Sequence, residues 1–363
     1  MKVLKFGGTS VGSAQRMKEV AKLITDGERK IVVLSAMSGT TNTLVEISDY
    51  LYKKNPEGAN EIINKLESKY RQHIDELFAT PEYKQKGLEL IKSHFDYIRS
   101  YTKDLFTLFE EKVVLAQGEL ISTAMMNYYL QECGVKSVLL PALEYMRTDK
   151  NAEPDPVYIK DKLQVQLELH PDAEIYITQG YICRNAYGEI DNLQRGGSDY
   201  TASLIGAAIN ASEIQIWTDI DGMHNNDPRI VDKTAPVRHL HFEEAAELAY
   251  FGAKILHPTC IQPAKYANIP VRLLNTMDPT APGTLISNDT EKGKIKAVAA
   301  KDNITAIKIK SSRMLLAHGF LRKVFEIFES YQTSIDMICT SEVGVSVSID
   351  NVKHLNEILD DLK

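Results

Sequence analysis

Short apolar runs alternate with amphipathic segments along most of the chain. Apolar positions that recur every three or four residues indicate helices over 14–24 and 202–211. Continuous apolar or β-branched runs are typical of strands buried in a parallel sheet, and strands that alternate with helices predict an α/β fold. We expect strands at 3–4, 31–34, 135–140, 173–178, 214–217 and 271–274.

Residues 44–115 interrupt this alternation. Charged residues are dense there, and apolar residues recur at helical spacing, which predicts a helical insertion on the sheet whose apolar stripe packs in a core. The stripe consists of Ile62, Leu66, Tyr70, Ile74 and Leu77.

The pattern changes again towards the C-terminus. Residues 279–289 are rich in Pro, Gly, Thr and Asn, which is typical of a connection between domains. We therefore predict a larger domain over 1–285 and a smaller one over 286–363. No catalytic constellation lies in the smaller domain, so we expect a regulatory or dimerising role. Its expected order is strand 304–309, helix 320–331, strands 334–338 and 343–349, and helix 352–362.

Composition narrows the class of protein. The chain has 363 residues, of which 44% are hydrophobic and 25% charged, as in a globular protein of two or three domains. Its net charge of −7 gives no electrostatic footprint for nucleic acid. No apolar run reaches the length of a membrane span, and the first residues enter a strand rather than a signal peptide. We expect a cytoplasmic protein.

Metal and disulfide sites find little support. The cysteines Cys133, Cys183, Cys260 and Cys339 form no C-x-x-C pair, so neither a zinc ribbon nor a disulfide framework is indicated. The aspartates between 219 and 227 lack the ladder and terminal Glu of a calcium loop. We assign no protein ligand to a metal.

Two glycine pairs carry the strongest candidate chemistry. Lys5-Phe6-Gly7-Gly8-Thr9-Ser10 follows a strand and precedes a helix, and Arg195-Gly196-Gly197-Ser198-Asp199 precedes another helix. Glycines let the backbone approach an anion, and N–H groups at a helix start favour negative charge. Each pair alone is also compatible with a turn and an N-cap. Two such pairs in one domain favour an anion site.

Two further charged residues have a local explanation. Residues 117–123 predict the start of a helix with Glu119 in its first turn, where a carboxylate is favourable without any function. Lys254 lies near the C-terminus of the helix expected over 242–255, where a cation is favourable. Local reasoning leaves both roles open.

Taken together, these motifs resemble the aspartokinases, which belong to the amino acid kinase superfamily. The resemblance rests on the two glycine motifs and continues to the end of the chain, so it covers essentially the whole sequence. The other segments that carry it are Leu34 to Gly39, Trp217-Thr218-Asp219, Asp227-Pro228-Arg229, Phe251 to Pro258, Asn303-Ile304-Thr305 and Thr340 to Val343.

The resemblance implies a three-layer amino acid kinase fold with a mainly parallel sheet. It also implies phosphoryl transfer from ATP to the side-chain carboxylate of L-aspartate, giving 4-phospho-L-aspartate, the first step towards lysine, threonine and methionine. A carboxylate is already ionised at neutral pH, so this reaction needs no general base. The cofactors implied are ATP and Mg²⁺, and the family leaves the ion mostly to phosphates and water.

The family's site residues fall on matching positions of this chain. The catalytic set is Lys5, Asp199 and Lys254, and the phosphate-binding set is Gly7, Gly8, Thr9, Gly196 and Gly197. The aspartate-binding set is Ser35, Thr41, Glu119, Tyr181, Arg195 and Ser198, with Arg195 on a carboxylate and Glu119 on the α-ammonium. The ATP-binding set is Thr218, Asp219, Gly222 and Arg229.

The C-terminal region resembles the ACT fold, which in this family binds end-product amino acids and pairs subunits. Lysine is the favoured feedback ligand, and we expect a homodimer through this region. Asp336 and Glu342 could pair a lysine ammonium, or they could be solvated loop charges. The positions that match a lysine site are Met314, Phe320, Asp336, Ser341 and Glu342.

Three departures from the family stand out. Gln194 occupies a position that is usually glycine, and His224 one that is usually tyrosine. The chain carries about one ACT unit, where the family usually has two.

Two other functions compete with an active aspartokinase. One is a kinase for glutamate, N-acetylglutamate or UMP. The Arg195 motif and Glu119 argue against it. The other is an amino-acid-sensing ACT protein with an inactive kinase domain. An inactive kinase domain is disfavoured because the chain retains Lys5, Arg195, Asp199 and Lys254 together.

Overall fold

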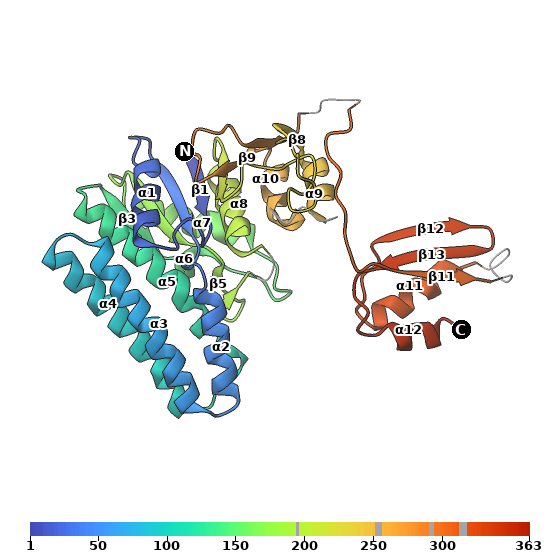
Figure 1. The fold of residues 1–363 in the computed structure, drawn as a ribbon, viewed down its shortest axis with the longest axis horizontal. Helices are drawn as coiled ribbons and strands as arrows, with labels where there is room; N and C mark the ends of the chain where they lie inside the picture. Colours follow the sequence, from blue (N-terminus) through green and yellow to red (C-terminus); the bar gives the residue numbers. More distant parts are fainter. Residues whose placement is uncertain (194–195, 251–255, 290–293, 312–317) are drawn as a thin grey trace. The chain divides into compact units, whose positions relative to one another are not determined.

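The computed structural model describes residues 1–193, 196–250, 256–289, 294–311 and 318–363. The chain divides into two compact units, unit 1 (Met1–Ala299) and unit 2 (Ala300–Lys363) (Figure 1). The domain boundary predicted after residue 285 falls inside strand β10 (Thr284–Ser287) of unit 1.

An eight-stranded sheet forms the centre of the described part of unit 1, in the order β3-β4-β2-β1-β7-β9-β10-β8. All pairings are parallel except that of β10 with β9. The connection predicted over 279–289 is therefore wrong in its middle, where β10 joins the sheet. The other strands are β1 (Lys2–Phe6), β2 (Lys30–Leu34), β3 (Ser137–Leu140), β4 (Ile175–Gln179), β7 (Ile214–Thr218), β8 (His239–His241) and β9 (Val271–Asn275).

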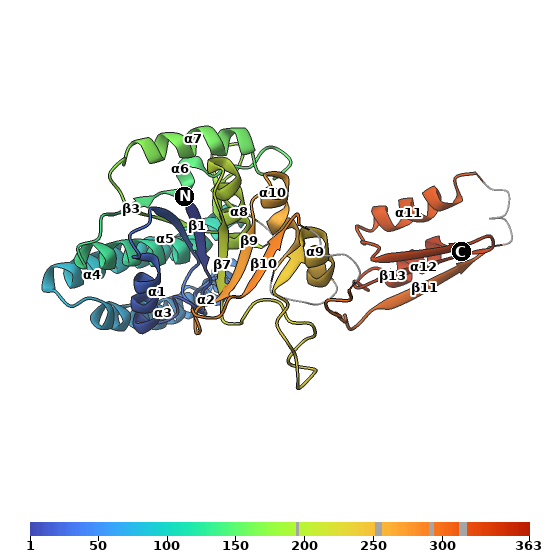
Figure 2. The same ribbon diagram turned by 90° about the horizontal axis from the view of Figure 1, so that it is seen from above.

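Helices cover both faces of this sheet (Figure 2). Alternate strand residues point to opposite faces, and two separate hydrophobic clusters result. Leu4 and Val32 pack with α1 (Ala14–Ile24), α2 (Thr40–Tyr52), α3 (Pro56–Leu77), α4 (Pro81–Ser100) and most of α5 (Leu108–Glu132). Val3 and Val33 pack with α6 (Ala142–Tyr145), α7 (Pro156–Glu168), α8 (Gly197–Ile209), α9 (Phe242–Tyr250) and α10 (Gln262–Tyr266). This confirms the three-layer α/β fold.

The helical insertion consists of α2 to α4, the 3₁₀ turn η1 (Tyr101–Lys103) and the start of α5. Of the predicted stripe, Leu66, Tyr70, Ile74 and Leu77 are buried, and Ile62 packs against the same core. The helix predicted to begin at Gln117 in fact begins at Leu108, where Thr107 and Glu110 form a capping box. Glu119 therefore lies about three turns inside α5, so its first-turn explanation is wrong.

The described part of unit 1 has two smaller features. A hairpin of β5 (Ile182–Arg184) and β6 (Ile190–Asn192) follows β4. The 3₁₀ turn η2 (Pro258–Ile261) precedes α10.

Unit 2 has the predicted βαββα order. Strands β11 (Thr305–Lys310), β12 (Met337–Ser341) and β13 (Gly344–Ile349) form an antiparallel sheet in the order β11-β13-β12. Helices α11 (Phe320–Ser330) and α12 (Leu355–Asp361) supply Val324, Phe328 and Ile358 to a small core with Val345 and Val347.

Candidate active site

The loops that carry several of the described candidate residues of unit 1 follow the ends of parallel strands. Phe6 of β1 lies opposite Leu34 of β2 and Trp217 of β7, and Leu34 lies opposite Gln179 of β4. The loops that follow these strands therefore leave the same edge of the sheet. Ligands of open α/β sheets bind beyond this edge.

An ion pair between Lys5 and Asp199 lies at the centre of the site. The Lys5 Nζ is 2.8 Å from Asp199 Oδ1, and the two side chains are 11% and 15% exposed. Lys5 extends from β1, and Asp199 lies in the first turn of α8. The carboxylate holds the ammonium beside the first glycine loop, where a Cβ on Gly7 would be in van der Waals contact with Lys5 Nζ at 3.4 Å.

The second glycine pair opens a helix as predicted, but the first does not. Gly196 is the N-cap of α8, with φ 71°. A Cβ on Gly196 would overlap Cys260 Sγ, so this position requires glycine. Helix α1 spans Ala14–Ile24 as predicted, but Ser13 is its N-cap, so the first glycine pair lies several residues before the helix.

The first glycine pair forms a loop rather than a helix start. A Cβ on Gly8 would lie 2.8 Å from the Ala36 carbonyl oxygen, so the loops after β1 and β2 touch through Gly8. Thr9 is exposed in the same loop.

Glu119 lies beneath the loop that follows β2. It is 3% exposed, and its Oε1 accepts a hydrogen bond from the Ala36 N–H at 3.3 Å. Its Oε2 has no hydrogen-bond partner among the described residues. Burial raises the pKa of this carboxyl to about 8. A buried carboxylate with a free oxygen suits a cationic ligand group.

Hydroxyl groups join the loops around Glu119. The Ser35 hydroxyl donates to Ser198 Oγ at 2.9 Å, and the Ser122 hydroxyl donates to the Ser35 carbonyl at 2.8 Å. Ser35 thus links β2 to both α8 and α5. Thr41 is half-buried in the first turn of α2.

Tyr181 has an unusual backbone conformation. Its φ is 69°, and the Ile182 N–H donates to the Gly180 carbonyl at 2.7 Å across it. This is a γ-turn with a left-handed central residue, which is rare and strained. The ring lies against Gly197, where a Cβ would be 3.2 Å from Tyr181 Cδ2. Burial, followed by the Glu119 charge, raises the pKa of its hydroxyl to about 12.

The residues predicted to bind ATP lie at the end of β7 and on the chain segment that follows it. Thr218 ends the strand, and Asp219 is exposed just beyond it. Gly222 has φ 76° and packs so closely on Thr284 that a side chain would not fit. Arg229 is exposed and pairs with Asp227 at 2.5 Å. At the family's tyrosine position, His224 Nδ1 lies 2.8 Å from Thr234 Oγ1.

Three predicted residues, Arg195, Lys254 and Met314, lie outside the described residues. In unit 2, Phe320 begins α11, and the Ser341 hydroxyl contacts the Gly344 carbonyl at 3.4 Å.

The remaining two predicted residues of unit 2, Asp336 and Glu342, flank opposite ends of β12. At about 3.3 Å per residue they are roughly 20 Å apart. One ammonium therefore cannot contact both within a single chain. Lys301 lies 3.7 Å from Asp336 and 2.7 Å from Asp350.

Sequence reasoning missed Ser122 and Thr201. The Thr201 hydroxyl accepts from the Tyr181 N–H at 3.0 Å and donates to the Gly197 carbonyl at 3.2 Å. Both residues follow a predicted site residue by one helical turn, Glu119 and Gly197 respectively. That spacing is a signal that could have identified them.

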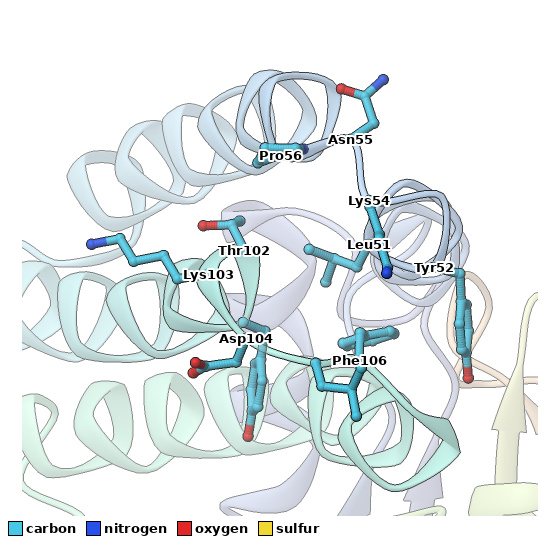
Figure 3. A pocket seen from close by; sticks show the side chains of 11 residues that line it. Leu51, Tyr52, Lys54, Asn55, Pro56, Thr102, Lys103, Asp104 and Phe106 are labelled. Atoms are coloured by element: carbon cyan, nitrogen blue, oxygen red, sulfur yellow. The ribbon is translucent and has the colours of Figure 1, made fainter.

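A cavity of about 360 Å³ lies apart from this site, between the α2–α3 turn and the segment that precedes α5 (Figure 3). Leu51 and Phe106 line it, together with polar side chains. The Lys54 and Lys103 ammonium groups lie on different sides of it, and Asn55 points away. Because its polar groups do not converge, we assign it no ligand.

Among the described residues there is neither a metal-binding cluster nor a membrane-spanning helix. No group of three or more His, Cys, Asp or Glu side chains is arranged to hold a metal ion. None of the described helices combines the length and apolar character needed to cross a membrane.

Residues 1–275 match the model of the amino acid kinase family. The chain therefore belongs to the amino acid kinase family, and its relatives place it among the aspartokinases. It is 38% identical to Aspartokinase 1, chloroplastic, of Arabidopsis thaliana over 97% of this chain and 63% of that protein. It is 35% identical to the lysine-sensitive aspartokinase 3 of Escherichia coli (strain K12), over 96% of this chain and 78% of that protein.

A solved structure agrees with these relatives. The crystal structure of E. coli aspartokinase III in complex with aspartate and ADP has a TM-score of 0.83 and 34% identity, over 97% of this chain and 79% of that one. The chain spans only 63–66% of the length of three Arabidopsis aspartokinases that it matches.

Proposed function

We propose that the chain transfers the γ-phosphoryl group of MgATP to the side-chain carboxylate of L-aspartate, giving 4-phospho-L-aspartate and ADP. One observation carries the proposal: the Lys5–Asp199 pair lies at the same sheet edge as the buried Glu119 carboxylate, whose Oε2 has no partner among the described residues. The first feature suits a phosphoryl group and the second suits an ammonium. An amino acid with a side-chain carboxylate could occupy both, with its ammonium at Glu119 and its side-chain carboxylate near the phosphoryl group.

The chemistry requires charge neutralisation more than proton transfer. A carboxylate oxygen of aspartate forms a bond to the γ-phosphorus, and the bond between this phosphorus and the bridging oxygen of ADP breaks. Both reactants are anionic, so the protein must stabilise negative charge on the phosphoryl oxygens. Lys5 supplies one positive charge, and the N–H groups at the start of α8 supply further donors.

The remaining residues would hold the aspartate. Glu119 would bind its α-ammonium, and Tyr181 would close the pocket. Ser198, whose hydroxyl accepts from Ser35, would donate a hydrogen bond to the substrate, and Ser35 Oγ would accept one. Asp199 orders Lys5 and does not act as a base. By resemblance, Arg195 binds a substrate carboxylate and Lys254 assists on the nucleotide side.

Magnesium enters this proposal as part of the MgATP substrate. The ion prefers phosphate and water oxygens. Asp199 is paired with Lys5 and Asp227 with Arg229, so we assign the ion no protein ligand.

An assay with hydroxylamine tests the proposal directly. The chain is incubated with MgATP and L-aspartate, and hydroxylamine converts any acyl phosphate to a hydroxamate. We expect product with aspartate, but none with glutamate or N-acetylglutamate. Product with glutamate alone would make the chain a kinase for another acid. ATP binding without product from any acid would favour the sensing protein.

For unit 2 we propose lysine-dependent feedback and dimerisation. The relative named lysine-sensitive supports this, as does the βαββα fold. Because Asp336 and Glu342 lie at opposite ends of β12, only one of them can contact a given ammonium within one chain. Titration with lysine, monitored by activity and by light scattering, tests both parts. Unchanged activity and a monomer at all concentrations would contradict them.

A further inference from the structure

The β5–β6 hairpin connects Tyr181 to the second glycine motif. Tyr181 precedes β5, and the hairpin is closed by the Leu193 N–H, which donates to the Tyr181 carbonyl at 2.7 Å. The hairpin therefore begins and ends at the candidate site. The position of its strands decides where the Tyr181 ring lies.

The two strands of the hairpin are held differently. The Arg184 N–H donates to the Met146 carbonyl, and the Arg184 carbonyl accepts from the Thr148 N–H, both at 2.9 Å. β5 is thus anchored by backbone bonds. Among the described residues, the polar contact that joins β6 to a helix is an ion pair between Asp191 and Lys112 of α5, with Asp191 Oδ1 2.7 Å from Lys112 Nζ. Asp191 Oδ1 also accepts from the Asn192 N–H.

This ion pair is largely shielded from water. The Lys112 and Asp191 side chains are 23% and 14% exposed. Lys112, Ala116 and Glu119 lie on one face of α5, at i, i+4 and i+7. Ala116 packs in the same cluster as Cys183 and Leu193. The face of α5 that presents Glu119 to the site therefore also holds the hairpin.

The strained Tyr181 turn explains why the hairpin needs such an attachment. A left-handed residue other than glycine costs on the order of 1–3 kcal/mol and persists only where its surroundings enforce it. The Thr201 hydroxyl holds the Tyr181 N–H, and Leu193 holds its carbonyl. The Thr201 contact requires Tyr181 to stay against α8, and the Leu193 contact ties Tyr181 to the end of β6, which the ion pair with Lys112 attaches to α5.

We infer that Lys112 and Asp191 are positioning residues, whose ion pair holds the β5–β6 hairpin on α5 and thereby keeps Tyr181 in its strained, site-facing conformation. The link to aspartate binding rests on the proposed function. The holding of the hairpin does not, because it can be measured without substrate.

Cys183 reports on the position of the hairpin. It lies opposite Asp191 in the β5–β6 register and is fully buried. Residues opposite each other in a pair of strands share a face, so Cys183 lies under the ion pair. Burial raises the pKa of its thiol to about 12, which makes it unreactive while the hairpin is in place.

The test combines thiol labelling with kinetics. The variants are Lys112→Met, Asp191→Asn, the conservative Lys112→Arg and the double swap Lys112→Asp/Asp191→Lys. Labelling of Cys183 by N-ethylmaleimide is followed by peptide mass spectrometry, with buried Cys260 as an internal reference. Arg272→Met is the matched control, because its pair with Glu213 is similarly shielded and lies elsewhere in unit 1.

We expect Lys112→Met and Asp191→Asn each to label Cys183 roughly tenfold faster, as for the loss of one coupled contact. They should raise the aspartate KM by a similar factor and leave kcat and the ATP KM nearly unchanged. Lys112→Arg and the double swap should restore both properties, and Arg272→Met should change neither.

Three outcomes are decisive. Unchanged Cys183 labelling in both neutral variants overturns the inference, whatever the activity. If the parent is active and the neutral variants label Cys183 faster but keep the parent's aspartate KM, the link between the hairpin and the site is overturned. A parent without aspartate-dependent product defeats the proposed function, while Cys183 labelling still decides whether the pair holds the hairpin. If the neutral variants do not fold, the double swap decides: Cys183 labelling at the parent's rate supports the inference, and faster labelling overturns it.

Discussion

Glu119→Gln should make unit 1 more stable at alkaline pH. Glu119 is 3% exposed, and burial raises its pKa from 4.5 to about 8. Between these two values the folded state holds a proton on this carboxyl that the unfolded state has released. The stability contributed by this proton is complete below about pH 4.5, and it is lost as the pH rises through about 8.

The size of the effect follows from the pKa difference. A shift of about 3.5 pKa units, at 1.36 kcal/mol each, corresponds to about 5 kcal/mol. Water entry and relaxation around the charge reduce this cost, so it is an upper limit. Glutamine cannot ionise. The advantage of the variant should therefore grow by up to about 5 kcal/mol between about pH 5 and about pH 9.

Denaturant titrations across this pH range measure the difference. Trp217 is the sole tryptophan of the sequence and lies in β7, so its fluorescence reports on unit 1. Glu61→Gln is the control, because Glu61 is exposed and Lys65 lowers its pKa; it should show no alkaline gain. L-aspartate should stabilise the parent but not Glu119→Gln. A stability difference that is the same at every pH would refute the reasoning.

Three further predictions concern the site. Lys5→Ala should lower kcat by about 10²–10³ and change the aspartate KM little; steady-state kinetics that show a normal kcat would remove Lys5 from the phosphoryl site. Gly196→Ala should lower the free energy of unfolding by about 2–4 kcal/mol, because its Cβ overlaps Cys260 Sγ and its φ is positive. Chemical denaturation should show most of that loss recovered in a Cys260→Ala background. Thr201→Val should cost about 1–3 kcal/mol by leaving the part-buried Tyr181 N–H unpaired, and Thr201→Ser should not; equal melting curves for the two would contradict this.

Much of the fold could be predicted because each strand of the centre is a compact apolar run. The four residues 31–34 form most of β2, and the βαββα order of unit 2 appears directly in its apolar pattern. Lys5 and Asp199 entered the candidate site together through the resemblance of their motifs to the aspartokinases, not through a local pattern. The apolar runs of the central strands are continuous because these strands are buried at both faces of the sheet.

The errors have physical causes. β10 lies in a stretch rich in turn residues, and pairing with β9 and β8 overrides that local preference. Buried residues occupy all sides of the middle of α5, so apolar periodicity gives no indication of where that helix begins. The Tyr181 γ-turn and the Lys112–Asp191 pair depend on contacts between distant segments. Local sequence patterns contain no such information.

The uninterrupted course of α5 limits how this region can change in evolution or by design. The helix is fixed at one end by the Thr107 capping box and carries Lys112 and Glu119 on one face. Inserting or deleting one residue between Thr107 and Glu119 would turn the carboxylate by about 100° and move it about 1.5 Å along the axis. The segment 108–119 should therefore keep its length.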